Sequence, residues 1–322
     1  MLIWKHTPKD GLLLGFSIVQ LAVTVWLAAQ WSRPSVLAWA GGFILLTLMM
    51  VYNIIVVSHL FTHVPWFYSA RLNGLVSLLN SINIGQSVQI YHLQHVRNHH
   101  RFNNDPRGPD GTTRDLSSTY RDGRDGEHTP VLRYIFSGAL GTFVSRGVEL
   151  LMVTRLWRVG AGEQRLLSLA SSREPARKTE LRQIQADRAA HCLALIGFAV
   201  ISWEWTLLCY LPAFFAALVL VNVQNYYRHY GADPANRATD SVSYYGRLYN
   251  LVAFNDGYHQ EHHTSPATHW SQLPAVRERR RAWLDAQPRI ISPVPAMLGF
   301  LHRGRPLLHR RAPSHHGGPQ VQ

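Results

Sequence analysis

The chain has 322 residues and a formal net charge of +13, with 32 Lys and Arg against 19 Asp and Glu. Its apolar residues are concentrated in a few long blocks, which argues against a pair of ordinary soluble domains. Because these blocks are long enough for a membrane, the charge favours a lipid surface or an acidic partner over nucleic acid. The two cysteines, Cys192 and Cys209, lie in apolar segments and indicate neither disulfides nor a cysteine-based metal site.

Two membrane spans are predicted near the N-terminus. Residues 11–31 and 35–57 each have the length needed to cross a bilayer and contain no ionised side chain. Only residues 32–34 separate them, so we expect a tight transmembrane hairpin. A cleaved signal peptide fits less well, because the first apolar run is too long and a second follows at once.

Two different segments precede the next long apolar block. Residues 101–128 are rich in Gly, Asp and Arg, which predicts an ordered surface loop. Residues 133–157 are largely apolar but carry Arg146 and Glu149. This mixture favours a helix at the membrane interface over another span.

A second hairpin is predicted in residues 189–223, a block that is too long for one span. We expect its arms at residues 189–203 and 206–223, with the turn at the sequence WEW, since tryptophan favours the membrane interface. Pro212 is expected to kink the second arm. The predicted fold class is an all-α integral membrane protein with four transmembrane helices in two hairpins.

The basic residues predict how these spans are oriented. Lys5 and Lys9 precede the first span, whereas the turn at its far end carries only Arg33. Residues 155–188 and the sequence RERRR at 277–281 flank spans on the same side as the N-terminus. Since basic flanks mark the cytoplasmic side, we expect most of the polar sequence to lie in the cytoplasm.

These boundaries predict a single domain over residues 1–322. We expect a cytoplasmic histidine-rich cap made of residues 58–188 and 224–305, followed by a disordered tail at 306–322. The expected location is the inner membrane of a bacterium, with the active site on the cytoplasmic side.

Histidines recur in four clusters with metal-ligand spacing. The clusters are His59 and His63; His92, His95, His99 and His100; Asn225 and His229; and His259, His262 and His263. Spacings of three or four residues place side chains on one face of a helix. One such pair would be weak evidence for a site, but all four clusters are predicted on the same side of the membrane. They can therefore converge on one site.

The ligand type indicates the chemistry. Neutral imidazole suits iron, zinc, copper or nickel. Even nine of these ten imidazoles, if they converge, exceed what one metal can use, and a structural zinc would need only four ligands. With no nucleophile or carboxylate pair nearby, two metals beside a lipid-embedded bundle favour redox chemistry on a hydrophobic substrate. Two iron ions that activate dioxygen are the simplest interpretation.

The sequences HLFTH, HVRNHH, NYYRH and HQEHH, in this order, resemble the histidine boxes of the membrane-bound fatty acid desaturase/hydroxylase superfamily. The stretch NDGYHQEHHTSPATHWSQLP is similar to the third box of its desaturases, and NYYRHYG resembles a box of its alkane hydroxylase branch. The resemblance covers roughly residues 35–275. It implies a mushroom-shaped fold, with four spans as the stem, a cytoplasmic cap, and two irons held by histidines. It assigns ligand roles to His59, His63, His95, His99, His100, His229, His259, His262 and His263, with Asn225 holding a metal-bound water.

The second box departs from the family pattern. The usual form is His-x-x-His-His, whereas here His95 stands four residues before His99, with His92 upstream. Either the extra residue is absorbed locally or His92 replaces His95 as the ligand.

Some neighbours of the boxes have expected roles that are less specific. Asn104 and Asp105 are expected to hydrogen-bond ligand histidines. His269 and Trp270 are expected to pack against the site, and Glu261 either orients an imidazole or lies on a solvated face.

Several alternatives stay open. A membrane cytochrome would need histidines buried within the spans, and a metal transporter would need ligands at mid-membrane depth, but these histidines lie at span ends. Within the enzyme class a desaturase of a fatty acyl or similar aliphatic chain is favoured, with alkane or fatty acid hydroxylation and decarboxylation to a terminal alkene as alternatives. The chain has no flavin or cysteine-cluster motif, so we expect a separate ferredoxin- or rubredoxin-like electron donor with its reductase.

Overall fold

The computed structural model describes residues 3–32, 35–153 and 160–310. Within them, five helices are long and apolar enough to cross a membrane: Asp10–Ala29, Val36–His63, Val131–Val153, Glu174–Ile201 and Trp203–His229. The predicted all-helical class is confirmed, and the number of candidate spans is five instead of four.

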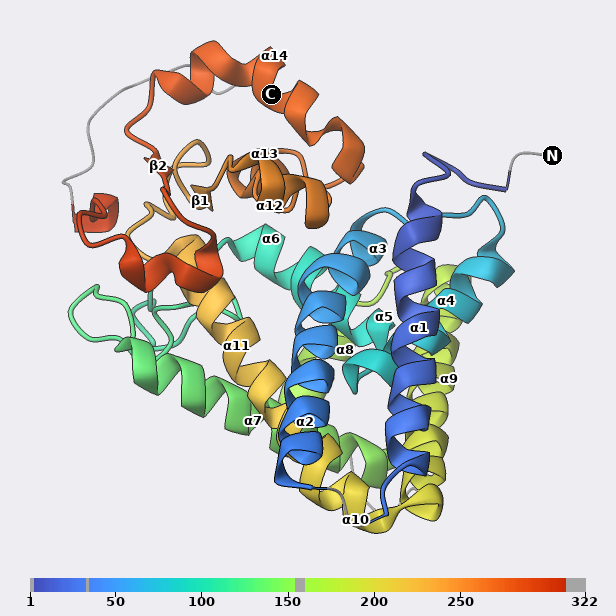
Figure 1. Ribbon diagram of the computed structural model, residues 1–322. Helices are drawn as coiled ribbons and strands as arrows, with labels where there is room; N and C mark the ends of the chain where they lie inside the picture. Colours follow the sequence, from blue (N-terminus) through green and yellow to red (C-terminus); the bar gives the residue numbers. More distant parts are fainter. Residues whose placement is uncertain (1–2, 33–34, 154–159, 311–322) are drawn as a thin grey trace.

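The first hairpin is present where the sequence predicted it. Helices α1 (Asp10–Ala29) and α2 (Val36–Tyr52) lie side by side in Figure 1. The second span does not stop at residue 57, because α2 continues through the π-helical turn η1 (Asn53–Ser58) into α3 (His59–His63). The first histidine box is therefore part of the end of a span.

The second hairpin is longer than predicted. Helix α9 (Glu174–Ile201) begins well before residue 189 and ends where Ser202 adopts an extended conformation. The Ser202 hydroxyl accepts a hydrogen bond from the Trp205 N–H and so caps α10 (Trp203–Trp205). The chain then returns through η3 (Thr206–Tyr210) and α11 (Leu211–His229). The turn is close to the predicted place, and the extra length comes from polar residues that pack on α4 and α5.

The fifth candidate span is α7 (Val131–Val153), the segment that the sequence placed at the interface. It packs on α11 and runs obliquely to α1 and α2 in Figure 1. Its Arg146 and Glu149 are buried and paired at 2.9 Å, and Arg188 of α9 lies 3.1 Å from the same Glu149 carboxylate. In the predicted basic segment 155–188, residues 155–159 lie outside the described residues.

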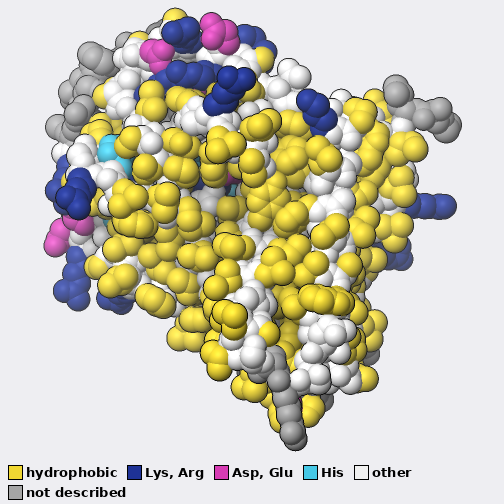
Figure 2. All heavy atoms as spheres, in the orientation of Figure 1, with side chains coloured by type: hydrophobic (Ala, Val, Ile, Leu, Met, Phe, Trp, Pro, Cys, Tyr) yellow, Lys and Arg dark blue, Asp and Glu magenta, His cyan; other side chains and the backbone are white. Residues whose placement is uncertain are grey.

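The remaining elements are α4 (Ala70–Ile84), α5 (Val88–His92), η2 (Leu93–His99), α6 (His100–Phe102), α8 (Ala161–Ser168), β1 (Val242–Ser243), α12 (Arg247–Val252), α13 (His259–Thr264), η4 (Trp270–Gln272), α14 (Leu273–Asp285), β2 (Ile290–Ile291), η5 (Ala296–Leu301) and η6 (Leu308–Arg310). Of these, α4, α5 and α8 lie alongside the long helices, and most of the C-terminal ones lie beyond one end of them (Figure 1). The two short strands pair in parallel, with Val242 opposite Ile290. Figure 2 shows a broad apolar surface over the long helices, with most of the basic and acidic side chains at the top of the view and along its sides.

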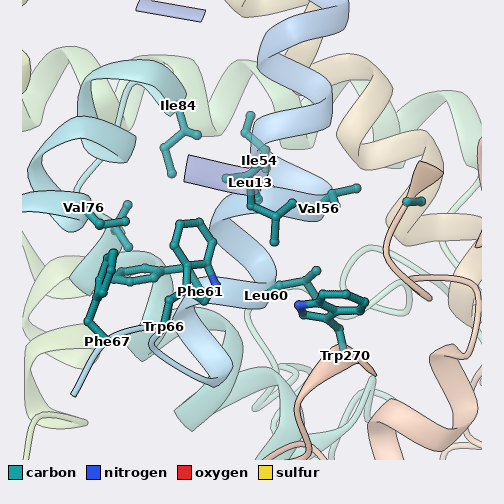
Figure 3. Packing of buried hydrophobic residues seen from close by; sticks show 13 residues of the cluster. Leu13, Ile54, Val56, Leu60, Phe61, Trp66, Phe67, Val76, Ile84 and Trp270 are labelled. Carbon is teal, nitrogen blue, oxygen red and sulfur yellow. The ribbon is translucent and has the colours of Figure 1, made fainter. Parts of the chain in front are cut away.

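An apolar cluster joins α1 and the segment after the third box to the first box. Leu60 and Phe61, which flank the box residues, pack with Leu13 of α1 and with Trp270 (Figure 3). The Trp270 indole donates to the Asp10 carboxylate at 2.8 Å, and a His269 ring nitrogen lies 3.1 Å from the same oxygen. His269 and Trp270 therefore have the packing role expected of them.

Two predicted loop assignments need correction. The 101–128 segment is ordered, but it is not simply a surface loop, because Asp115, Thr119 and Tyr120 in its middle are buried. The predicted disordered tail begins too early, since η6 is helical and Arg310 pairs with Glu127 at 2.7 Å. The rest of that tail, residues 311–322, lies outside the described residues.

Candidate metal centre

The four boxes converge at the ends of α2 and α11. Ring nitrogens within 4.8 Å of one another form two groups, a group of five (His59, His63, His95, His100 and His262) and a group of three (His99, His229 and His263). His259 lies beside the group of three, with ring centroids 4.5 Å from His263 and 5.3 Å from His229. All nine predicted histidines are thus brought together.

Each ring in the group of three is oriented by a hydrogen bond at Nδ1. The partners are an Asp115 carboxylate oxygen at 2.7 Å for His99, the Asp240 carbonyl at 3.1 Å for His229, and the Asn103 amide oxygen at 2.7 Å for His263. Acceptors at Nδ1 fix the proton there and leave the Nε2 lone pair free. All three Nε2 atoms are buried without a partner among the described residues, which fits a metal ion between them.

The group of five has fewer protein partners. His100 Nε2 lies 3.2 Å from His95 Nε2 and 3.1 Å from His262 Nε2. Both ring nitrogens of His59 are buried without a hydrogen-bond partner among the described residues, and its Nδ1 lies 3.7 Å from Asp256. Leaving a buried polar atom unpaired costs about 1–3 kcal/mol. Crowded, unsatisfied imidazole nitrogens of this kind fit a second metal ion.

The charge state of the histidines suits metal binding. Burial, reinforced by neighbouring imidazoles, holds the pKa of His95, His100, His259, His262 and His263 well below 6.5. These rings are therefore neutral near pH 7 and offer lone pairs. Burial alone would raise the pKa of Asp115, but the adjacent His99 ring and its hydrogen bonds hold that pKa below its usual value. Asp115 is thus a carboxylate that accepts from His99.

The extra residue of the second box is absorbed by a π-helical turn. Residues Leu93–His99 form η2, in which the backbone bonds skip one residue more than in an α-helix. The wider turn brings His95 to the group of five and His99 to the group of three. His92 instead bonds through Nδ1 to the Thr62 carbonyl at 2.9 Å and belongs to neither group.

Asn104 and Asp105 do not bond the histidines as the sequence analysis expected. The Asn104 N–H donates to Asp115 at 2.8 Å, and the Asp105 carboxylate accepts from the Asp115 N–H at 2.8 Å. They hold Asp115, which in turn holds His99. Sequence reasoning missed Asp115, Asn103 and Asp240. The only signal was the density of Asp and Asn after the second box, which does not single out one of them.

Glu261 and Asn225 both make hydrogen bonds to side chains of other segments. Glu261 is buried and accepts hydrogen bonds from Ser243 at 3.0 Å and Tyr245 at 2.6 Å, so neither expected role holds and it ties α13 to its neighbours. The Asn225 amide donates to Tyr134 at 2.6 Å. Asn225 also lines a cavity of about 180 Å³ that reaches His59 and His95.

Comparison with known proteins agrees with this site. The family model described as fatty acid desaturase matches residues 34–293. A sphingolipid delta(4)-desaturase of Komagataella phaffii is 32% identical over 126 residues, which are 36% of this chain and 34% of that protein. The sphingolipid delta(4)-desaturase DES1 of Drosophila melanogaster is 39% identical over 62 residues (19% of each chain), and that of Bos taurus is 35% identical over 83 residues (26% and 25%).

These matched segments cover about a third or less of the length of the relatives. The family model, by contrast, covers most of the chain and all four histidine boxes. Its match, together with five apolar helices and two histidine groups, identifies an integral membrane protein. This chain belongs to the fatty acid desaturase family.

Proposed function

We propose that the protein is a dioxygen-dependent diiron oxidoreductase that desaturates a fatty acyl or similar long aliphatic chain. The observation that carries this proposal is the convergence of two imidazole groups, each of which contains buried ring nitrogens without a hydrogen-bond partner among the described residues. Two bound irons would supply the reductive activation of dioxygen, which side chains alone cannot perform. The family membership supports the same reaction class and leaves the cytochrome and transporter alternatives without support.

The ligand assignment follows the two groups. One iron would be held by the group of five, and the other by the group of three together with His259. Asn225, which lines the same cavity as His59 and His95, would hold a metal-bound water. In this arrangement Asp115 keeps the His99 proton on Nδ1, and burial of the rings excludes bulk water from the centre.

Four of the five candidate helices would cross the membrane, with α7 at the interface. The buried charges Arg146 and Glu149 and the oblique course of α7 support this placement. The N-terminal end of α1 and the third box lie at the same end of the bundle, since Asp10 bonds Trp270. Lys5, Lys9 and the arginines of α14 at that end support a cytoplasmic site.

Electrons would come from a separate acidic carrier, a ferredoxin- or rubredoxin-like protein with its reductase. Helix α14 packs on α13, which carries the third box, and it exposes Arg279, Arg280 and Arg281. A basic face this close to the centre would speed encounter with an acidic carrier. Replacing the three arginines with Gln should raise the carrier concentration needed for half-maximal rate. Unchanged carrier kinetics, with a C-terminal segment that detaches from the liposome surface, would instead assign the arginines to lipid headgroups.

The direct test is expression of the full chain in a host that lacks similar enzymes, with mass spectrometry of its lipids and hydrocarbons. Desaturation predicts products that have lost two hydrogens. A hydroxylated chain or a terminal alkene would replace the proposed reaction with one of its alternatives. Metal analysis of the active protein should find two irons per chain. Zinc as the sole activity-supporting metal would contradict the redox chemistry.

A further inference from the structure

A polar cleft runs along one face of α7. It begins beside the histidine groups and extends from there toward α8. The cavity of about 180 Å³ that reaches His59 and His95 shares Gln94, Arg121 and Arg146 with a second cavity of about 390 Å³, which extends to α8. The two cavities are therefore neighbouring parts of one cleft. Such a shape can hold a ligand that extends from the candidate metal centre to α8.

The sequence of α7 shapes this cleft. Small or polar residues recur in adjacent pairs every four positions, at Ser137–Gly138, Gly141–Thr142 and Ser145–Arg146, and so form two rows on one helical face. A carbon added at Gly141 would meet nothing within 4 Å. From Gly138 to Arg146 the rows extend about 12 Å at the rise of an α-helix.

The lining of the cleft combines apolar and basic side chains. The cavity that reaches His59 and His95 is lined by Ile54, Leu218 and Val221, which suit aliphatic carbons, and also by Arg228, which is paired with Asp256. Arg121 and Arg146 line this cavity and the one that extends to α8. Among the described residues, the only carboxylate in the lining is Glu163, which is already paired with Arg188.

Arg146 has a hydrogen-bond donor without a partner among the described residues. Its side chain is buried, with 7% of its surface exposed, and one terminal nitrogen is paired with Glu149. Its Nε is buried without a hydrogen-bond partner among the described residues. A buried, unsatisfied guanidinium nitrogen beside a cavity favours an oxygen acceptor with negative charge.

We propose that this cleft binds the anionic oxygen head group of an amphiphilic substrate, a carboxylate or a phosphate, with Arg146 as donor. The aliphatic carbons then extend toward His59 and His95. This inference rests on the proposed function and narrows its substrate class, since alkanes and other uncharged long chains lack the acceptor that Arg146 requires.

The test measures binding of palmitate, hexadecyl phosphate and hexadecane to the purified full-length protein in nanodiscs, corrected for empty nanodiscs. We expect one or both anionic probes to bind more tightly than hexadecane. Arg146→Gln should weaken the preferred anionic probe by about tenfold or more, the size of a lost charged hydrogen bond, and leave hexadecane unchanged. The exposed Arg133 of α7 gives the matched control, Arg133→Gln.

A second pair of variants avoids the ion pairs of Arg146. Gly141 lines the cleft and Gly147 does not, and a carbon added at either meets nothing within 4 Å. Gly→Leu raises helix propensity at both places. Gly141→Leu should block binding of the anionic probe, whereas Gly147→Leu should not.

The palmitate and hexadecyl phosphate arms distinguish a carboxylate from a phosphate head group. Equal binding of all three probes, or binding that neither Arg146→Gln nor Gly141→Leu reduces, would overturn the inference. Because binding needs no turnover, the proposed function can fail separately: the anionic preference would then persist in a protein that forms no oxidised product.

Discussion

The two histidine groups are built differently although they share one centre. Each ring in the group of three has a protein acceptor at Nδ1, and all three side chains are buried. In the group of five, His95 and His100 contact other imidazoles, and His63 and His95 are only partly buried. His59 and His95 also line the cleft.

This difference indicates a division of labour. Hydrogen bonds from the surrounding chain fix ring orientation and the protonated nitrogen before a metal binds, so the group of three is preorganised. The group of five depends more on the metal itself to order its rings, and it faces the cleft where we place the substrate. If each group binds an iron as proposed, we infer that the first group would anchor its metal and that the second would leave its metal accessible from the cleft.

The largest expected effect is loss of a ring from either group. Replacing His63, His262 or His229 with Ala should lower turnover by about three orders of magnitude or more, because no further imidazole among the described residues lies in place to substitute. Oxidised product measured with purified protein and carrier checks this. His315→Ala and His316→Ala, in the tail outside the described residues, should keep full activity. Substantial turnover in any of the three box variants would remove that residue from the ligand set.

The second-largest effect is expected from removing one of the hydrogen bonds at Nδ1 that orient the group of three. Asp115→Asn keeps the shape but removes the charged acceptor for His99, and losses of this kind typically cost about 10–100-fold in metal affinity or activity. Iron retention after dialysis against a graded chelator gives the measurement. Asp110→Asn is the matched control, because Asp110 lies in the same loop but is exposed and bonds only Thr112. Equal iron loss in both variants would show that Asp115 does not support the metal.

Chelation of the unmodified protein sharpens the comparison between the groups. We expect two phases of iron release, with the first from the group of five, since it is partly exposed and lines the cleft. Iron analysis over time, with a spectroscopic signature of the iron that remains, separates the phases. Release of both irons in one phase would contradict the inferred division.

The smallest expected effect is that of His92→Ala. It should only impair turnover, because the His92 ring bonds the Thr62 carbonyl beside His63 and would act by positioning. A lost neutral hydrogen bond of about 1 kcal/mol corresponds to a few-fold change. His95→Ala, which removes a member of the group of five, should abolish turnover. Steady-state rates of the two variants decide the matter, and the reverse ranking would mean that η2 does not place His95 as a ligand.

The sequence by itself determined the class of the protein and the histidines of the candidate site, but not the residues that orient them. Hydropathy locates the two predicted hairpins, because a span needs about 20 apolar residues in a row. The histidines are readable because helical periodicity is local, so a spacing of four residues alone places His59 and His63 on one face. The absence of a carboxylate pair or nucleophile among the boxes then favours metal chemistry.

The tertiary structure decided which histidines form each group and which residues orient their rings. His99 and His100 are neighbours in sequence but belong to different groups, since the π-helical turn and the direction of each side chain separate them. Asp115 accepts from His99 in a loop that folds back along the chain, where Asn104 and Asp105 hydrogen-bond to Asp115. The α7 cleft likewise needs α8 and α11 beside it. Contacts between distant segments depend on the packing of the whole chain, and no local pattern encodes them.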